Sequence, residues 1–173
     1  MNTTIHTRPL LAVLLAASAW AMAAQGESLP SFEATSLTGK SVHSAQLSGQ
    51  PTILIVTPSR DAAGDTRRWA EALRTKLDDS AIRVRDVLAI DLPFFMDESD
   101  ALGLARKKIP SRYHDQTWLY AKPKLEKELG IPLDSARAFV LVLGADGSIL
   151  ERVDGSPTDG RLEAILSAVR SMK

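Results

Sequence analysis

The chain has 173 residues, contains no cysteine, and carries 21 lysines and arginines against 21 aspartates and glutamates. The absence of a thiol excludes disulfide bonds and thiol-based redox chemistry, because both need a cysteine sulfur. The balanced charge argues against nucleic acid or anionic lipid as the main partner, since both demand a basic surface.

The first 23 residues have the pattern of a secretory leader. Arg8 precedes an apolar run over 10–17, and residues 21–23 (Ala-Met-Ala) supply the small-x-small pattern recognised at signal cleavage. The run is shorter than the ~20 residues of a membrane-spanning helix. We therefore expect a cleaved signal peptide over 1–23, one domain over 24–173, a periplasmic location and no stable membrane anchor.

The residues after the leader predict a hairpin, a buried strand and a helix. Gly39 marks a turn between two short extended pieces. Residues 52–56 are apolar without alternation, as in a strand covered on both faces. A helix over 65–77 follows, with its apolar residues spaced along one face and Asp65 as its N-cap.

The middle of the chain continues this alternation. A second apolar strand within 84–91 completes a β-α-β unit, which implies parallel pairing of the two strands. Helices are predicted near 99–107 and over 122–129, the second of them ended by Gly130. Between them lies a short aromatic stretch over 117–120.

The last third predicts two antiparallel strands and a closing helix. The strand over 138–143 is joined to a partner strand over 148–153 by the turn residues Asp146 and Gly147. A helix over about 159–172 follows. The order of elements predicts an α/β fold, with a central mixed sheet, helices on both faces and an N-terminal hairpin.

Five pieces of sequence carry a family resemblance by their order and spacing. They are 29–32 (Leu-Pro-Ser-Phe), 37–40 (Leu-Thr-Gly-Lys), 47–51 (Leu-Ser-Gly-Gln-Pro), 125–131 (Leu-Glu-Lys-Glu-Leu-Gly-Ile) and 139–147. With them the chain resembles the redoxin branch of the thioredoxin-like superfamily, which includes AhpC/TSA peroxiredoxins and exported TlpA-type thioredoxins. Its layout is also similar to that of YtfJ-type periplasmic proteins. The resemblance implies a thioredoxin-like fold.

The same resemblance shows what this chain has lost. Aligned as a TlpA-type thioredoxin, its two redox positions fall on Asp61 and Gly64; aligned as a peroxiredoxin, the peroxidatic position falls on Asp65. The usual cis-proline position falls on Arg137 or Ala138. Neither alignment supplies a thiolate, so thiol oxidoreductase and peroxidase activity are excluded.

The turn after the strand over 52–56 is the candidate binding site, because open α/β folds bind ligands at the carboxyl ends of their strands. The resemblance implies that Arg137 matches the arginine that peroxiredoxins hold near their thiolate, so we expect it to face this turn and to pair with Asp61 or Asp65; the alternative is that it holds a ligand. Alternatively, the acidic residues only stabilise the start of the helix. The candidate residues are Thr57, Pro58, Ser59, Arg60, Asp61, Asp65 and Arg137.

A second candidate is a partner-binding surface formed by the aromatic residues Tyr113, Trp118 and Tyr120, since aromatics are enriched at interfaces. These residues could equally be core. The segment 93–96 (Pro-Phe-Phe-Met) is expected to fold inward; if exposed, it would suggest a contact surface instead.

These observations favour an exported, redox-inactive thioredoxin-like module that binds an unknown periplasmic protein or peptide. The alternative is an enzyme or ligand-binding protein that uses aspartate and arginine chemistry in the former redox pocket. Beyond the leader the only histidines are His43 and His114, so we expect no zinc or copper site and no cofactor.

Overall fold

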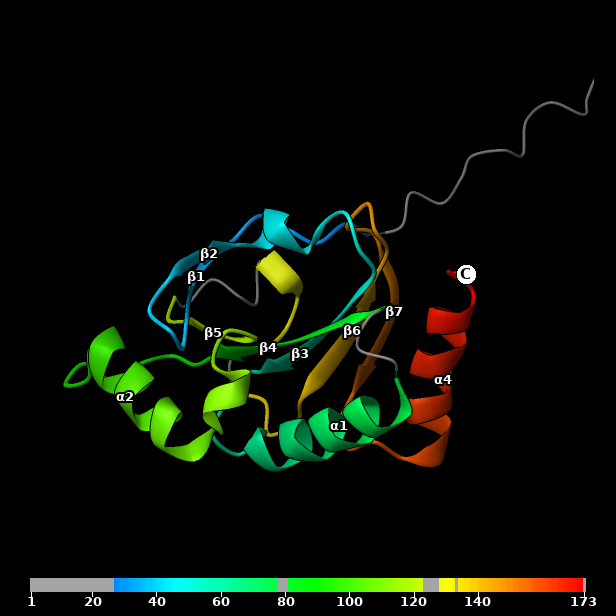
Figure 1. The fold of residues 1–173 in the computed structure, drawn as a ribbon. Coiled ribbons are helices and arrows are strands. Elements are labelled where there is room, and N and C mark those ends of the chain that lie inside the picture. Colours follow the sequence, from blue (N-terminus) through cyan, green and yellow to red (C-terminus); the bar gives the residue numbers. More distant parts are fainter. Residues whose placement is uncertain (1–26, 78–80, 123–127, 133, 173) are drawn as a thin grey trace, which may run out of the picture.

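The computed structural model describes residues 27–77, 81–122, 128–132 and 134–172. In this part of the chain, seven strands form one sheet in the order β2-β1-β5-β4-β3-β6-β7 (Figure 1). The strands are β1 (Glu33–Ser36), β2 (Ser41–His43), β3 (Thr52–Thr57), β4 (Arg83–Ala89), β5 (Thr117–Tyr120), β6 (Phe139–Leu143) and β7 (Ile149–Asp154).

The sheet is mixed, as the sequence predicted. β3, β4 and β5 run parallel to one another, whereas β6 and β7 are antiparallel to their neighbours. The N-terminal hairpin of β1 and β2 joins the sheet through an antiparallel pairing of β1 with β5. The α/β class, the central mixed sheet and the N-terminal hairpin predicted from the sequence are therefore confirmed.

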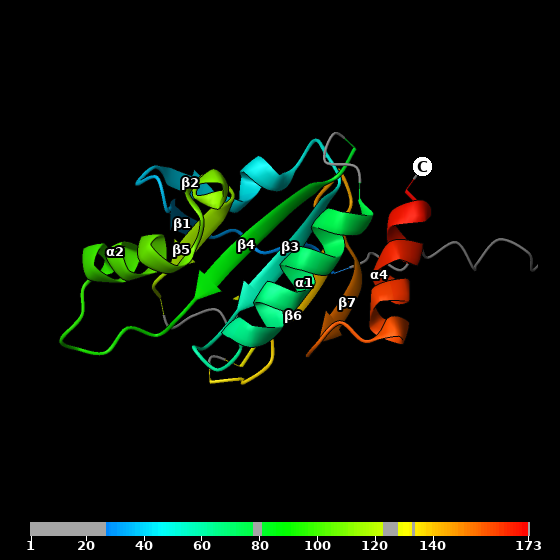
Figure 2. The same ribbon diagram turned by 60° about the horizontal axis from the view of Figure 1, so that its bottom comes forward.

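Among the described residues, the helices α1, α2 and α4 lie on one face of the sheet. Here α1 runs across β3, and α4 lies beside β7 (Figure 2). The bounds of these helices are Ala63–Lys76 for α1, Glu98–Lys108 for α2 and Asp159–Arg170 for α4. The other face is covered by the 3-10 helix η1 (Ser44–Leu47) and by the segment of Leu129 and Ile131. Most of the helix predicted over 122–129 belongs to residues 123–127, which lie outside the described residues.

The two faces of the central strands fill separate apolar cores. On β3, Ile53 and Ile55 pack with Trp69 and Leu73 of α1, whereas alternate residues of the strand point to the opposite core. All six residues of β3 are buried, which explains why its sequence is apolar without alternation.

The start of α1 differs from the sequence prediction. The helix begins at Ala63 with Ala62 at the N-cap, so Asp65 lies in the first turn and is not the cap. Asp65 still carries negative charge where the helix dipole favours it. No helix of the described residues is long and apolar enough to cross a bilayer.

Candidate functional site: the bend between β3 and α1

The candidate site lies where β3 passes into α1, at the carboxyl end of a central strand. Thr57 and Pro58 are buried, whereas Arg60 and Asp61 are exposed on the outer side of the bend. Among the described residues, neither exposed side chain has a hydrogen-bond or ion-pair partner. The bend therefore presents one positive and one negative side chain to solvent.

Hydroxyl groups hold the inner side of the bend. The Thr57 and Thr66 hydroxyl oxygens lie 2.7 Å apart, within hydrogen-bond distance. Ser59 Oγ donates to the carbonyl oxygen of Ser135 at 2.7 Å, which ties the bend to the segment before β6. The Ser59 hydroxyl hydrogen is therefore already engaged, and a ligand could accept a hydrogen bond from it only by displacing the Ser135 carbonyl oxygen.

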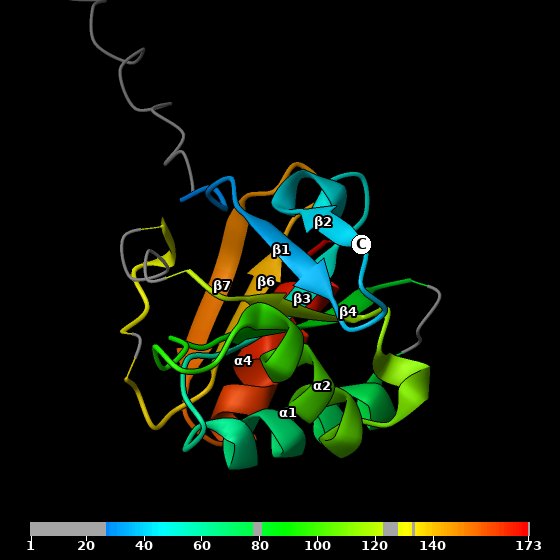
Figure 3. The same ribbon diagram turned by 90° about the vertical axis from the view of Figure 1, so that its left-hand side faces the viewer.

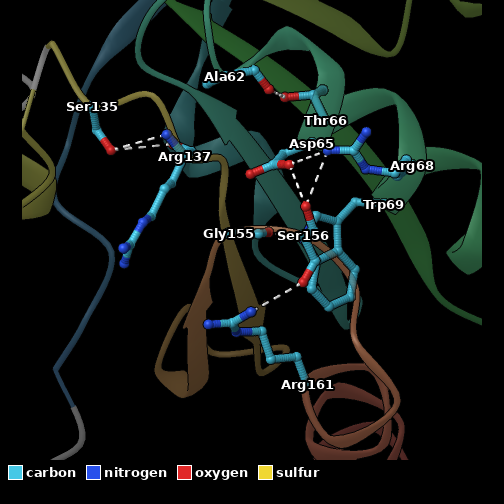
Figure 4. Close-up of polar contacts among 10 residues, drawn as sticks. All are labelled: Ala62, Asp65, Thr66, Arg68, Trp69, Ser135, Arg137, Gly155, Ser156 and Arg161. Atoms are coloured by element: carbon cyan, nitrogen blue, oxygen red, sulfur yellow. Dashed lines mark hydrogen bonds and ion pairs between the residues drawn. The ribbon is translucent and has the colours of Figure 1, made fainter.

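Asp65 is held by short hydrogen bonds (Figure 4). Ser156 Oγ and Arg68 Nη2 both donate to Asp65 Oδ1 at 2.5 Å. Burial by itself raises the pKa of Asp65, but hydrogen bonds from Ser156 and Arg68 outweigh it. The charge of Arg68 and the backbone N–H of Ala138 act in the same direction, so the pKa stays below its ordinary value. Asp65 is thus a fixed carboxylate, unsuited to proton transfer near neutral pH.

A second contact ties α1 to the turn after β7. The buried Trp69 donates from Nε1 to the carbonyl oxygen of Gly155 at 2.6 Å, and the Gly155 N–H donates to the carbonyl oxygen of Ala138 at 2.8 Å. Gly155 has a φ of +85°, a left-handed conformation that glycine adopts without strain. The start of α1, the start of β6 and the turn after β7 therefore form one hydrogen-bonded unit.

Arg137 does not reach the bend, so its expected pairing with Asp61 or Asp65 is wrong. Its Nη1 donates instead to Asp154 Oδ2 at 2.9 Å, and the side chain points away from Asp65 (Figure 4). Arg68 satisfies Asp65 from the same helix, three residues along, and leaves no need for a distant cation. The Arg137–Asp154 pair is exposed and contributes only ~0–1 kcal/mol.

A carboxylate with a raised pKa lies beneath α1, away from the bend. Asp86 of β4 pairs through Oδ2 with Arg74 Nη2 at 2.8 Å, and its Oδ1 is buried without a hydrogen-bond partner. Burial raises the pKa of Asp86, and the attraction of Arg74 offsets only part of this effect. The guanidinium of Arg74 also covers the ring of Tyr113, 4.1 Å from its centroid, so this acid is sealed inside the protein.

The predicted aromatic surface is corrected by the structure. Trp118 and Tyr120 are only 3% and 2% exposed, because β5 lies between β1 and β4 and is covered on both faces. Tyr120 donates its hydroxyl to Glu128 Oε2 at 2.5 Å. Tyr113 is half-buried under the guanidinium groups of Arg74 and Arg112.

The exposed aromatics lie elsewhere, in the loop between β4 and α2. Phe94 is fully exposed and Phe95 is 71% exposed, and their rings meet edge to face with centroids 5.4 Å apart. The expectation that this segment folds inward is therefore wrong, since the loop projects beyond the sheet and has no core to enter (Figure 2). The described residues hold no group of three or more acidic or histidine side chains placed to bind a metal ion.

The sequence matches no protein-family model and no curated protein. The fold is similar to solved thioredoxin-like proteins. The thioredoxin domain of a thiol-disulfide oxidoreductase from Bacteroides vulgatus is 13% identical, with a TM-score of 0.59 over 87% of this chain and 99% of that one. A thiol peroxidase from Chromobacterium violaceum is 14% identical, with a TM-score of 0.59 over 86% of this chain and 89% of that one.

An exposed lipoprotein thioredoxin from Streptococcus pneumoniae is 14% identical, with a TM-score of 0.58 over 82% of this chain and 98% of that one. The chain therefore has a thioredoxin-like fold, as the sequence predicted. The neighbours named as thiol enzymes act through a sulfur chemistry for which this chain has no residue.

Proposed function

We propose that this chain is an exported, redox-inactive thioredoxin-like protein that binds a protein or peptide and carries out no catalysis. The observation that carries the proposal is the bend itself. It has no thiol, and its inner polar groups are satisfied within the protein, while Arg60 and Asp61 remain exposed. Such a surface suits an electrostatic contact at the rim of a partner interface better than chemistry on a substrate.

Export is supported by the leader pattern over 1–23 and by the fold neighbour named as an exposed lipoprotein. This chain has no cysteine to carry a lipid, so we propose that it is released into the periplasm after cleavage.

The catalytic alternative lacks support at the bend. A proton-transferring carboxylate needs a pKa near the working pH, in a site that a substrate can enter. The pKa of Asp65 is instead lowered, Arg137 pairs with Asp154, and the raised pKa of Asp86 belongs to a carboxylate buried beneath α1.

The redox part of the proposal is tested by restoring the thiols. The chain over 24–173 is expected to show no turnover in disulfide-reduction and peroxide assays. The Asp61→Cys/Gly64→Cys variant places thiols at the positions that align with a dithiol motif, and we expect it to gain disulfide-reducing activity. Turnover by the unmodified chain would overturn the proposal, and a folded but inactive double variant would show that the alignment of the bend is wrong.

The binding part is tested by affinity capture from periplasmic extract, with bound proteins quantified by mass spectrometry. A partner enriched by the unmodified chain should be lost by Arg60→Glu and by Asp61→Lys. The matched control is Lys76→Glu, an exposed charge reversal in the last turn of α1. Equal capture by all variants would place the contact away from the bend, and the absence of any enriched protein would count against a binding role.

A further inference from the structure

Helix α2 has two faces of different character. Leu102, Ala101, Ala105 and Ile109 face the protein and pack in the core that contains Leu119. A second stripe holds Asp100, Gly103, Leu104 and Lys107, spaced at i, i+3, i+4 and i+7 along the helix. Figure 3 looks onto this end of the molecule, where α2 lies in front and its outer side is uncovered.

The second stripe borders a hollow of about 350 Å³ whose other wall includes Phe95 and Met96. Leu104, in the middle of the stripe, is 43% exposed. Exposed phenylalanines and a leucine beside a hollow are the features of a contact surface rather than of a solvated helix.

The charges along this stripe are self-complementary. Asp100 and Lys107 lie two turns apart, about 10 Å along the axis, with Gly103 and Leu104 midway between them. An identical helix placed antiparallel on this stripe would set each Asp100 against the Lys107 of the other copy. This reciprocal contact, in which residue i meets j and j meets i, is what a two-fold symmetric interface requires.

Gly103 is a second indication that another helix packs against this stripe. Glycine inside a helix costs about 1 kcal/mol relative to alanine, and a Cβ added at Gly103 would meet nothing within 4 Å. The packing within one chain therefore gives no reason for glycine at this position. A second helix crossing at Gly103 would give one, because the missing side chain lets two backbones approach closely.

We propose that two copies of this chain associate through α2, antiparallel, about a two-fold axis beside Gly103 and Leu104. In this dimer Leu104 enters the hollow of the other copy, and Phe95 lies over the C-terminal turn of the other α2. Phe95 can there receive the Lys107 ammonium on its ring. The inference involves α2 and not the bend, so it stands apart from the proposed function.

A lipid surface is a poorer occupant for this stripe. The first turn of α2 carries Glu98 and Asp100, with Asp97 as the N-cap, so negative charge flanks the exposed rings. Anionic headgroups would be repelled there. The last turn of α2 is basic, and an antiparallel second copy uses both ends of the helix, because it sets Asp100 of one copy against Lys107 of the other.

The experiment is a charge-swap series on the chain over 24–173, measured by sedimentation velocity from about 1 to about 200 µM, a range suited to a small interface. The unmodified chain should shift from monomer to dimer. Asp100→Lys and Lys107→Asp should each weaken dimerisation at least tenfold, because each sets like charges against one another. The Asp100→Lys/Lys107→Asp double variant restores opposite charges and should recover the dimer. Leu104→Ser should abolish it.

Two matched controls separate the interface from general surface effects. Lys76→Glu reverses an exposed charge on α1, and Leu150→Ser removes an exposed leucine on β7; both should leave the dimer unchanged. A chain that stays monomeric at every concentration overturns the proposal. The proposal is also overturned if the single charge variants dimerise as strongly as the unmodified chain, or if the double variant does not recover the dimer. Circular dichroism confirms that each variant is folded.

Discussion

Two aspartate–arginine ion pairs, one near each end of α1, show that carboxylates in the same kind of pair can have their pKa shifted in opposite directions. Asp65 at the start of the helix and Asp86 beneath its later turns each pair with an arginine of α1. Asp65 also accepts hydrogen bonds from Ser156 and from a backbone N–H, and its pKa falls. Burial of Asp86 raises its pKa, and the attraction and hydrogen bond of Arg74 offset only part of this effect. The extent of burial, weighed against the hydrogen bonds that each carboxylate accepts, therefore decides the direction of the pKa shift.

The largest expected effect comes from removing the arginine at each end. Arg74→Ala removes the ion-pair partner of the buried Asp86 carboxylate and should lower the free energy of unfolding by about 3–5 kcal/mol. Arg68→Ala should cost less than about 1 kcal/mol, because Arg68 is largely exposed and Asp65 keeps its other donors. Urea denaturation at pH 7 measures both. Equal losses at the two ends would contradict the comparison.

The next largest effect tests the hydrogen-bonded unit that joins the start of α1 to the turn after β7. Trp69→Phe keeps an aromatic ring in the core but removes the Nε1 donor, which leaves the buried Gly155 carbonyl oxygen without this partner. We expect a loss of about 2 kcal/mol, measured by thermal and urea denaturation. Tyr113→Phe is the matched control, since its ring remains under Arg74 and no hydrogen bond through its hydroxyl is described. It should change stability by less than about 0.5 kcal/mol.

A smaller effect is expected at Ser156. Ser156→Ala removes one of the short hydrogen bonds to Asp65 but leaves Arg68 in place. Stability at pH 7 should fall by about 1 kcal/mol, and the pKa of Asp65, followed by carboxyl NMR titration, should move up toward its ordinary value. An unchanged pKa would show that Ser156 does not determine the behaviour of this carboxylate.

The smallest expected effect is a difference in sign between the contributions of Asp65 and Asp86 to the pH dependence of stability. The lowered pKa of Asp65 stabilises the fold above its unfolded value of 3.8, and this stabilisation is lost as pH falls through the folded pKa. The raised pKa of Asp86 acts oppositely: its contribution falls as pH rises from 3.8 through the folded pKa. The test is the difference in unfolding free energy between the unmodified chain and each of the variants Asp65→Asn and Asp86→Asn, measured across acid pH. The two differences should change with pH in opposite directions. Parallel slopes would refute the contrast.

The sheet was readable from sequence because its central strands are covered on both faces. The uninterrupted apolar run of β3 and the Asp-Gly turn between β6 and β7 are local signals, and both elements lie where they were predicted. The burial of β5 was harder to predict, because only four residues form this strand and its burial depends on β1, which is far away in the sequence. Trp118 and Tyr120 therefore looked like candidates for a surface.

The bend was located correctly, but its contacts were not. Ser156 lies 91 positions from Asp65, and no sequence pattern connects them. Arg68 could have been found, since an acid and a base three residues apart on a helix commonly pair. The exposure of Phe94 and Phe95 depends on how far the loop projects from the sheet, which no local pattern encodes.

The N-terminal edge has a consequence for the order of folding. The N–H of Leu29 bonds to the carbonyl oxygen of Gly147, and the N–H of Ile149 bonds to the carbonyl oxygen of Glu27. β1 likewise pairs only with β2 and with β5, which comes more than eighty residues later. When the chain emerges N-terminus first, residues 27–29 can therefore be fixed only after the β6–β7 hairpin has been made, and contacts of such long sequence separation form slowly.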